Sequence, residues 1–594
     1  MSTTVADFVL DRLTEWGVRR IFGYPGDGIN GFLGALDRAG DEFEFVQARH
    51  EEMAAFMATG HAKFTGELGV CLATSGPGAI HLLNGLYDAR LDGAPVVALV
   101  GQQRRMSLGA EYQQEVDLEG LFTDVAAFVQ TCMDASQARH LIDRAARIAL
   151  DRRSVAAVIF PADVQIEPAV ESPPRMHGVV LSSAGWTTPI VRPREHDLDQ
   201  AARVLNAGSR VAILAGQGAR DAADELTKVA DVLGAGIAKA LLGKDILPDD
   251  LSFVTGAIGL LGTRPSYELM RGCDTLLIVG SSFPYSEWLP EEGQARCVQI
   301  DIDGSALAIR YPVEVPLIGD ARETLRSLLP RLRRNEDVSF RNKIEDDVHE
   351  WRTVLERRAH APADPLNPEL VAFELSRRLP DRCILTADSG SSTVWWAQQI
   401  RVRSGMRASL SGGLATMGSA VPYAIAAKLA HPDRPVVAFL GDGAAQMGGL
   451  MELATAQRYA DRWTEPTFVV CIFNNRDLNM VTWEQRVLAG DPEYPASQTL
   501  PDLPYARIAE LIGLKGIRVD QPELLPVALE DAFTCGVPVV VEAVVDPDIP
   551  PMPPHVSFEQ GANLVQALLR GDPDRSGVLR KTLRAKLEDL ITRS

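Results

Sequence analysis

Two apolar runs, each followed by a short polar turn, constrain the fold of this chain more than any other feature. The first run covers residues 436–440, and a Gly-Asp-Gly turn at 441–443 follows it directly. The second run covers residues 468–473 and ends at Asn474-Asn475, with a helical segment between the two runs. This order predicts a βαβ unit whose two strands are parallel and whose crossover is right-handed.

The two turns of this unit carry residues that suit a metal ion. Parallel strands end at the same edge of a sheet, so we expect Asp442 and Asn475 to lie side by side there. Carboxylate and amide oxygens are hard ligands for Mg²⁺ or Ca²⁺, which often take phosphate oxygens as well. Gly441 and Gly443 allow a close approach of the backbone to a ligand. The residues alone therefore predict a site for a metal and a diphosphate, and the alternative is a pair of ordinary surface turns.

Length, charge and cysteine usage limit the class of protein. At 594 residues the chain is too long for one core, and its net charge of −20 argues against a general nucleic-acid binder. No apolar run approaches about 18 residues, so no transmembrane helix is expected. The N-terminus shows no secretory signal, and the seven cysteines form no CxxC pair. These features predict a cytoplasmic protein with reduced thiols.

Residues 1–170 alternate between helical and strand patterns, which predicts a doubly wound α/β domain. Glu51 opens one of its helices, and an acidic residue at a helix start has an ordinary structural explanation, since it favours the positive end of the helix dipole. A second Gly-Asp-Gly at 26–28 has no diamide turn at a matching distance, so we interpret it as a turn and not as a second metal site.

Several motifs together resemble the thiamine diphosphate (ThDP) enzymes. The Gly-Asp-Gly and Asn-Asn turns form the signature of that superfamily, with a gap several residues longer than is usual. The stretches 49–56, 74–78 and 84–88 resemble the pyrimidine-binding domain of pyruvate oxidases and acetohydroxyacid synthases. The resemblance implies that Glu51 hydrogen-bonds the aminopyrimidine ring and stabilises the imino tautomer that removes the C2 proton.

The resemblance also implies the remaining site residues. Mg²⁺ would be held by Asp442, Asn475 and the main-chain oxygen of Asp477, and Met417 would bend the cofactor, although a lone methionine is more often core packing. Gln114 matches the family's catalytic glutamine, whereas Gln113 replaces a phenylalanine that lines the substrate pocket, which leaves the identity of the 2-oxo acid open. The implied ThDP contacts are Gly26, Ser75, Gly390, Ala415, Thr416, Met417, Gly441, Asp442, Gly443, Ala444, Asn475, Leu478 and Met480.

Residues 190–334 form a predicted central domain that follows a Pro- and Ser-rich linker. A strand that enters a Gly turn at 211–218, and a strand that ends at Asp301, are typical of nucleotide sites but leave the question open on spacing alone. The resemblance to flavin-containing pyruvate oxidases implies FAD, and the alternative is a purely structural domain. The implied FAD contacts are Gly256, Gly259, Ser282, Phe283, Pro284, Tyr285 and Asp301.

Residues 366–550 form the predicted diphosphate-binding domain, and residues 551–594 form a tail. An apolar stripe on a basic helix marks the end of the tail. Such a helix can lie on a membrane surface, but packing on this or a neighbouring subunit is the favoured interpretation. The stripe comprises Leu579, Leu583, Leu587 and Leu590, beside Arg580, Lys581, Arg584 and Lys586.

The sequence thus predicts three doubly wound parallel-sheet domains. In the resembled family these are the pyrimidine-binding, central and diphosphate-binding domains. The resemblance implies a homodimer or homotetramer with active sites between subunits. The implied reaction is decarboxylation of a 2-oxo acid such as pyruvate, with oxidation of the hydroxyalkyl-ThDP intermediate through FAD and transfer of electrons to quinone or oxygen. Acetolactate synthase-like carboligation, suggested by residues 480–484 and Gln113, and non-oxidative decarboxylation are the alternatives. A non-enzymatic descendant is disfavoured because Glu51, Asp442 and Asn475 are all present.

Overall fold

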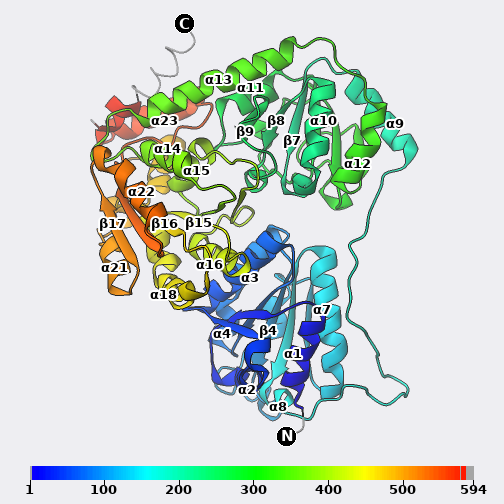
Figure 1. Ribbon diagram of the computed structural model, residues 1–594. Coiled ribbons are helices and arrows are strands. Elements are labelled where there is room, and N and C mark those ends of the chain that lie inside the picture. The colour runs from blue at the N-terminus through cyan, green and yellow to red at the C-terminus, as the bar shows by residue number, and fades with distance from the viewer. Residues whose placement is uncertain (1–2, 576, 583–594) are drawn as a thin grey trace.

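Three parallel β-sheets of six strands each form the framework of the computed structural model, which describes residues 3–575 and 577–582. Helices pack on the faces of each sheet (Figure 1). Half of the strands are buried along their whole length, which explains why these strands appear in the sequence as continuous apolar runs and not as alternating patterns. The predicted α/β class with three doubly wound sheets is confirmed.

The first sheet has the strand order β2-β1-β3-β4-β6-β5. Its strands are β1 (Arg20–Gly23), β2 (Glu44–Gln47), β3 (Gly69–Ala73), β4 (Val96–Gln102), β5 (Phe128–Thr131) and β6 (Val155–Pro161). Its main helices are α1 (Val5–Glu15), α2 (Asn30–Ala39), α3 (Glu51–Thr65), α4 (Pro77–His81), α5 (Leu83–Leu91) and α7 (Ala138–Arg152).

The second sheet has the order β12-β11-β10-β7-β8-β9. Its strands are β7 (Val211–Ala215), β8 (Gly236–Lys239), β9 (Val254–Ala257), β10 (Thr275–Val279), β11 (Arg296–Asp301) and β12 (Val315–Ile318). The helices around it are α9 (Glu195–Asn206), α10 (Ala223–Leu233), α11 (Arg264–Gly272) and α12 (Ala321–Leu328).

The third sheet has the order β14-β13-β15-β16-β18-β17. Its strands are β13 (Ile384–Ala387), β14 (Arg407–Leu410), β15 (Val436–Gly441), β16 (Phe468–Asn474), β17 (Lys515–Val519) and β18 (Val539–Val544). The main helices are α14 (Pro368–Arg378), α15 (Ser391–Gln399), α16 (Ala420–Ala430), α18 (Leu450–Tyr459), α19 (Asn479–Glu484), α21 (Tyr505–Leu511) and α22 (Leu525–Thr534). β15 and β16 are parallel neighbours, as the βαβ prediction requires.

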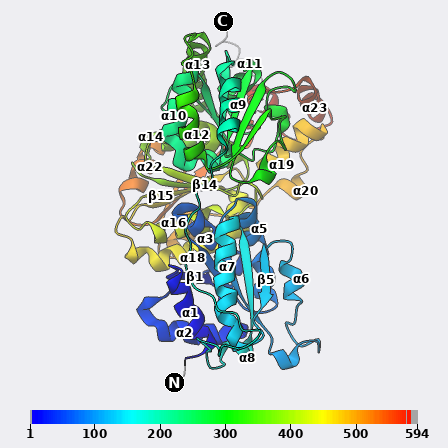
Figure 2. The same cartoon turned by 90° about the vertical axis from the view of Figure 1, so that its right-hand side faces the viewer.

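The third sheet lies between the other two in space. Figure 2 shows the second sheet (β7 to β12, called the middle sheet for its place in the chain) at the top. The third sheet lies in the centre and the first at the bottom. A long extended segment, residues 166–194, runs along the outside of the molecule from the first sheet to α9 (Figure 1). Helix α13 (Ser339–Ala359) then connects the middle sheet to the third, and it buries Trp351 and Val354 among other apolar residues of one face.

Packing of α3 against α16 joins the first and third sheets into one core. Phe56 of α3 meets Tyr423 of α16 edge-on, with ring centroids 6.4 Å apart. The Tyr423 hydroxyl donates to the buried carboxylate of Asp88. Lys63, at the far end of α3, donates to the Leu410 carbonyl at 2.7 Å. The edges of the first and third sheets are therefore fixed relative to each other within one chain.

The tail folds back on the third domain through helix α23 (Phe558–Leu569). The buried guanidinium of Arg486 donates to both carboxylate oxygens of Asp572, at 2.7 and 2.9 Å. Lys581 donates to Asp546 at 2.5 Å. Packing on this subunit is thus observed as far as residue 582. Leu583, Arg584, Lys586, Leu587 and Leu590 of the predicted basic helix lie outside the described residues.

Two further observations concern the chain as a whole. Among the described residues, no helix is both long enough and apolar enough to cross a bilayer. All seven cysteines are free, and six of them are buried. Burial raises the pKa of the Cys71 thiol to about 12, which suits an unreactive core residue.

Candidate active site

The carboxyl edge of the third sheet brings Asp442 and Asn475 together, as the parallel strands predict. Asp442 follows β15 and accepts from the main-chain N–H of Gly443 at 2.9 Å and of Arg476 at 2.5 Å. Arg476 is the residue after Asn475, so the two turns are in direct contact. The Asn475 side-chain oxygen accepts from the N–H of Asp477 at 3.1 Å. All three predicted metal ligands therefore lie at this edge.

The charges at this edge suit a divalent cation. Asp442 is 2% exposed, and burial raises the pKa of its carboxyl to about 7, with a further contribution from the nearby Asp477. Burial also raises the pKa of Asp477, whose carboxylate accepts from Asn479 and Thr482. A buried and a half-buried acid close together are costly without a compensating charge. Hard oxygen ligands around them fit Mg²⁺ or Ca²⁺.

Asp388, at the end of β13, organises the loop that carries the predicted cofactor contacts 415–417. Its carboxylate is fully buried and accepts from the N–H groups of Ser389, Gly418 and Ala420 at 2.9–3.0 Å. Ala415 has a φ of +53°, a conformation that non-glycine residues rarely adopt. Three main-chain bonds to one carboxylate therefore hold an otherwise unfavourable loop in place. Of this turn, only Gly390 was singled out from the sequence, and the role of Asp388 was not predicted.

Gly443 lies between Met417 and Leu478. A Cβ atom built on Gly443 would lie 2.7 Å from Leu478 Cδ2 and 3.2 Å from Met417 Cε. Three of the predicted ThDP contacts are thus adjacent, although they come from separate loops. Ala444, which follows, is buried. Gly390 precedes α15 with a φ of +125°, which only glycine adopts readily.

The first sheet contributes a second cluster around Glu51. Glu51 is the first residue of α3, and 7% of its surface is exposed. The Glu51 Oε2 atom lies 3.0 Å from His81 Nδ1, and the His81 ring lies against that of His50 with centroids 4.3 Å apart. A Cβ on Gly78 would come within 3.1 Å of Glu51 Oε1, so glycine is needed beside the carboxylate. His50 and His81 were not singled out from the sequence.

Ser75 and Gln114 lie next to this cluster. The Ser75 hydroxyl is 3.3 Å from the Gln114 side-chain oxygen and accepts from Gln103 at 3.2 Å. Gln114 itself has a φ of +63°, and a Cβ on Gly76 would lie 2.8 Å from its Cβ. Gly26 belongs to the same edge, because a Cβ there would meet the Thr74 side chain at 2.5 Å. Gln113 is exposed.

Contacts between the first and third sheets lie beside both clusters. The Asn84 side chain donates to Thr416 Oγ1 at 3.0 Å, and the N–H of Arg49 donates to Glu452 Oε1 at 2.6 Å. Glu452, which the sequence analysis missed, is fully buried on α18. Each chain therefore carries both clusters in fixed positions. That Glu51 and Asp442 act on one cofactor from two different chains stays a prediction.

The carboxyl edge of the middle sheet gathers the residues predicted to contact FAD. Gly256 lies within β9 and Gly259 just after it, both with φ near +100°, and a Cβ on Gly259 would lie 3.0 Å from the Phe283 ring. Ser282, Pro284 and Tyr285 are exposed after β10, while Asp301 ends β11 and accepts from the N–H of Asp303 at 3.0 Å. An open edge that spans strands β11 to β9 suits an elongated ligand such as a dinucleotide.

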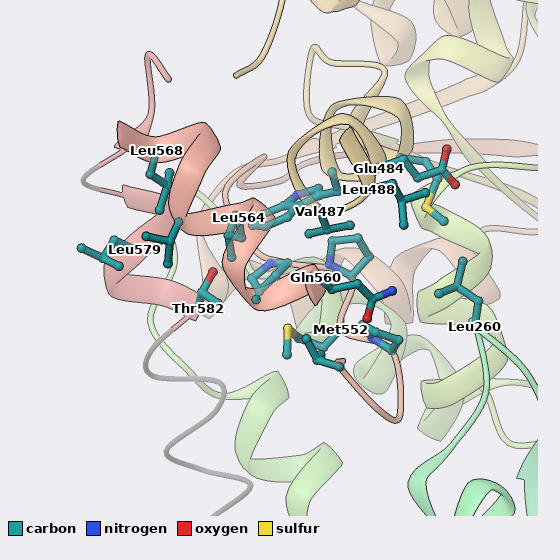
Figure 3. A pocket seen from close by; sticks show the side chains of 18 of the residues that line it. Leu260, Glu484, Val487, Leu488, Met552, Gln560, Leu564, Leu568, Leu579 and Thr582 are labelled. Carbon is teal, nitrogen blue, oxygen red and sulfur yellow. The ribbon is translucent and has the colours of Figure 1, made fainter. Parts of the chain in front are cut away.

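An apolar pocket of about 200 Å³ lies where the middle domain, α19 and the tail meet (Figure 3). Leu260 enters from the middle domain, and Met480 and Trp483 come from α19. Residues 550–553 and helix α23 supply the remaining wall, with Leu564 among the lining residues. Met480 thus faces a different environment from Leu478, only two residues away, and links the predicted cofactor loop to this pocket.

Comparison with known proteins identifies the family. Three family models match in order: the N-terminal TPP binding domain of thiamine pyrophosphate enzymes at residues 3–121, the central domain at 198–328 and the C-terminal TPP binding domain at 388–543. YdaP of Bacillus subtilis, described provisionally as a thiamine pyrophosphate-containing protein, is 36% identical over 96% of both chains. The chain belongs to the thiamine pyrophosphate enzyme family.

The relatives of this thiamine pyrophosphate enzyme include proteins with two different named activities. The pyruvate oxidase of Lactiplantibacillus plantarum is 30% identical over 91% of this chain and 88% of its own. The acetolactate synthase of Arthrospira platensis is 30% identical over 92% of this chain and 96% of its own. The predicted superfamily is confirmed, and the family supports an enzyme of pyruvate oxidase or acetolactate synthase type that uses ThDP.

Proposed function

We propose that this protein is a ThDP- and Mg²⁺-dependent 2-oxo acid decarboxylase, with pyruvate as the expected substrate, that passes the electrons of the reaction to FAD. The observation that carries the proposal is the pair of clusters at the sheet edges. Glu51, Ser75 and Gln114 lie together on the first sheet, and Asp442 and Asn475 lie together on the third. Similarity to a pyruvate oxidase over most of both chains supports the oxidative branch.

The chain's own groups have distinct tasks in this proposal. Bound ThDP would supply a nucleophilic carbon and a thiazolium ring that accepts the electron pair left behind when CO₂ departs, and bound FAD would supply a two-electron oxidant. Asp442, Asn475 and the main-chain oxygen of Asp477 hold Mg²⁺ and, through it, the diphosphate. Glu51 exchanges a proton with the pyrimidine ring from a position fixed by His81 and by the start of α3.

The remaining contacts shape the space around the reacting atoms. Met417 and Leu478 meet at Gly443 and form an apolar wall that would exclude water from bound ThDP. Gln114, beside Ser75, donates its amide N–H to the substrate carboxylate. The open edge at Gly259 and Tyr285 receives FAD, and the electrons leave to quinone or oxygen.

Carboligation is the second candidate, because Met480, Trp483 and Glu484 line the apolar pocket and an acetolactate synthase is equally similar. Product analysis with pyruvate separates the two. An oxidase releases one CO₂ and one acetate or acetyl phosphate for each acceptor reduced by two electrons. A synthase consumes two pyruvates for each CO₂ and forms acetolactate with no acceptor reduced. Acetolactate as the main product in the presence of FAD and an acceptor would overturn the oxidase proposal.

A further inference from the structure

A cleft of about 330 Å³ lined by both charged and apolar side chains lies where the middle domain, α13 and the third domain meet. Its walls come from β9, from residues 348–356 of α13 and from residues 397–401 at the end of α15. None of the residues predicted to contact ThDP lines it, and only Gly256 is shared with the predicted FAD contacts. The cleft is therefore separate from the clusters described above.

Positive charge dominates the lining of this cleft. Four basic side chains line it, Lys244, Arg352, Arg377 and Arg401, against two acids, Asp249 and Glu356. The Asp249 carboxylate is already engaged, since one oxygen accepts from Lys239 Nζ at 2.7 Å and the other from the N–H of Val402 at 2.8 Å. Glu356 is exposed at the rim.

Two of the arginines lack a carboxylate partner. Within the described part of the chain, no ion pair joins Arg352 or Arg401 to an acid. The Arg352 guanidinium donates only to the Asp249 main-chain carbonyl, at 2.6 Å. Burial and the like charge of Arg401 lower the pKa of Arg352. The two guanidinium groups therefore repel each other, and the negative charges of Asp249 and Asp250 act on Arg352 in the opposite direction.

The floor of the cleft holds a buried lysine. Lys244 is 4% exposed and lies 5.0 Å above the Trp396 ring. Its Nζ donates to the Ala397 carbonyl at 3.2 Å, which offsets the negative end of the α15 dipole, and lies 3.9 Å from Asp249. Burial lowers the pKa of Lys244 to about 8. Nearby Trp351 leaves its buried indole N–H without a partner among the described residues.

We propose that this cleft binds a small oxyanion of charge −2 or more, either inorganic phosphate or the phosphate group of a metabolite. Guanidinium forks match the oxygens of such anions in pairs, and Lys244 supplies a further donor from below. The ligand would bridge three parts of the molecule, because Lys244, Arg352 and Arg401 come from the middle domain, α13 and the third domain.

Calorimetric titration of the protein saturated with ThDP and Mg²⁺ tests this proposal, since the diphosphate site is then filled. Inorganic phosphate is titrated at constant ionic strength set with chloride. We expect a dissociation constant of about 1 mM or tighter. We expect Arg401→Gln and Arg352→Gln each to weaken binding at least fivefold and the double variant to abolish it. Arg507→Gln, on α21 and 66% exposed, is the matched control and should bind as the wild type does.

Glycerol 3-phosphate in the same titration distinguishes the sources of the anion. Tighter binding than inorganic phosphate points to a phosphorylated metabolite, and weaker binding points to free phosphate. Equal phosphate binding by the wild type and the double variant, or no heat from the wild type, would overturn the proposal. ThDP affinity of each variant, measured separately, shows that it is folded. An oxidase that forms acetyl phosphate would also bind phosphate at its active site, so the difference between the wild type and the double variant is the measure of binding in this cleft.

Discussion

His81 Nδ1 lies 3.0 Å from Glu51 Oε2, so the carboxylate that begins α3 is held by a ring from the end of α4. The contact joins two loops at the carboxyl edge of the first sheet. It fixes the direction of the Glu51 side chain, while Gly78 leaves room for the other carboxylate oxygen. A carboxylate positioned in this way suits proton exchange with a bound heteroaromatic ring.

Glu51→Gln should leave ThDP bound but lower kcat by about 10²–10⁴-fold, because the amide cannot exchange the proton. ThDP affinity measured by calorimetry and turnover measured with pyruvate separate the two effects. Glu52→Gln is the control, since Glu52 accepts from Asn84 and an amide oxygen can replace it. Turnover of the Glu51 variant within twofold of the wild type would show that Glu51 has no catalytic role.

Gly443→Ala should lower the stability of the apoprotein by about 1–3 kcal/mol, because its Cβ would press on Leu478 and Met417. It should also weaken ThDP binding by displacing both side chains. Gly441→Ala is the control for apoprotein stability, because a Cβ there meets no atom within 4 Å. Urea unfolding of both variants without cofactor is the measurement. Equal stability of the two variants would contradict the close packing described for Gly443.

Glu452 should make the junction between the first and third domains less stable as the pH rises. Burial raises the pKa of this carboxyl from 4.5 to about 7. The folded protein therefore binds the extra proton more tightly than the unfolded chain does. Its stabilising contribution is complete below pH 4.5 and is lost as the pH rises through about 7. The total change is up to about 3 kcal/mol.

Glu452→Gln cannot titrate, so the free energy of unfolding of the variant, relative to that of the wild type, should increase between pH 5 and pH 8. Urea unfolding at the two pH values measures it. Asp531→Asn, at an exposed ion pair with Lys515, provides the control and should show little such change. A wild-type minus variant difference that is the same at both pH values would contradict the assignment.

The ion pair of Arg486 with Asp572 should hold the tail over the apolar pocket. Asp572→Ala removes the carboxylate that pairs with the buried Arg486 guanidinium through both oxygens. The guanidinium keeps its ion pairs with Glu493 and Asp574, so the loss should cost about 1–3 kcal/mol locally. Limited proteolysis should then cleave the tail before the rest of the chain. The double variant Arg486→Met with Asp572→Leu should restore protection. Identical cleavage rates in the wild type and Asp572→Ala would show that the pair does not anchor the tail.

The sequence predicted those parts of the structure that depend on short-range patterns. The strands at 436–440 and 468–473 are apolar because both faces of a parallel sheet are covered, so their positions and the meeting of Asp442 with Asn475 followed from periodicity and topology. The resemblance supplied the cofactor and the role proposed for Glu51.

The missed features depend on contacts between distant parts of the chain. Asp388 accepts hydrogen bonds from residues 30 or more positions away, and Glu452 accepts one from Arg49 at a separation of 403 residues. A lone acid in a sequence carries no sign of such partners. The basic cleft was hidden for the same reason, since Lys244 and Arg401 meet only when two domains pack together.

The visible absorption spectrum of the purified protein, recorded anaerobically before and after addition of pyruvate with ThDP and Mg²⁺, tests the central claim most directly. Incubation with FAD and gel filtration come first, so that a vacant site is filled. We predict a yellow protein that bleaches on addition of pyruvate, because electrons from decarboxylation reach the flavin. A protein that retains no flavin, or a yellow protein that stays yellow while pyruvate is consumed, would contradict the oxidase account.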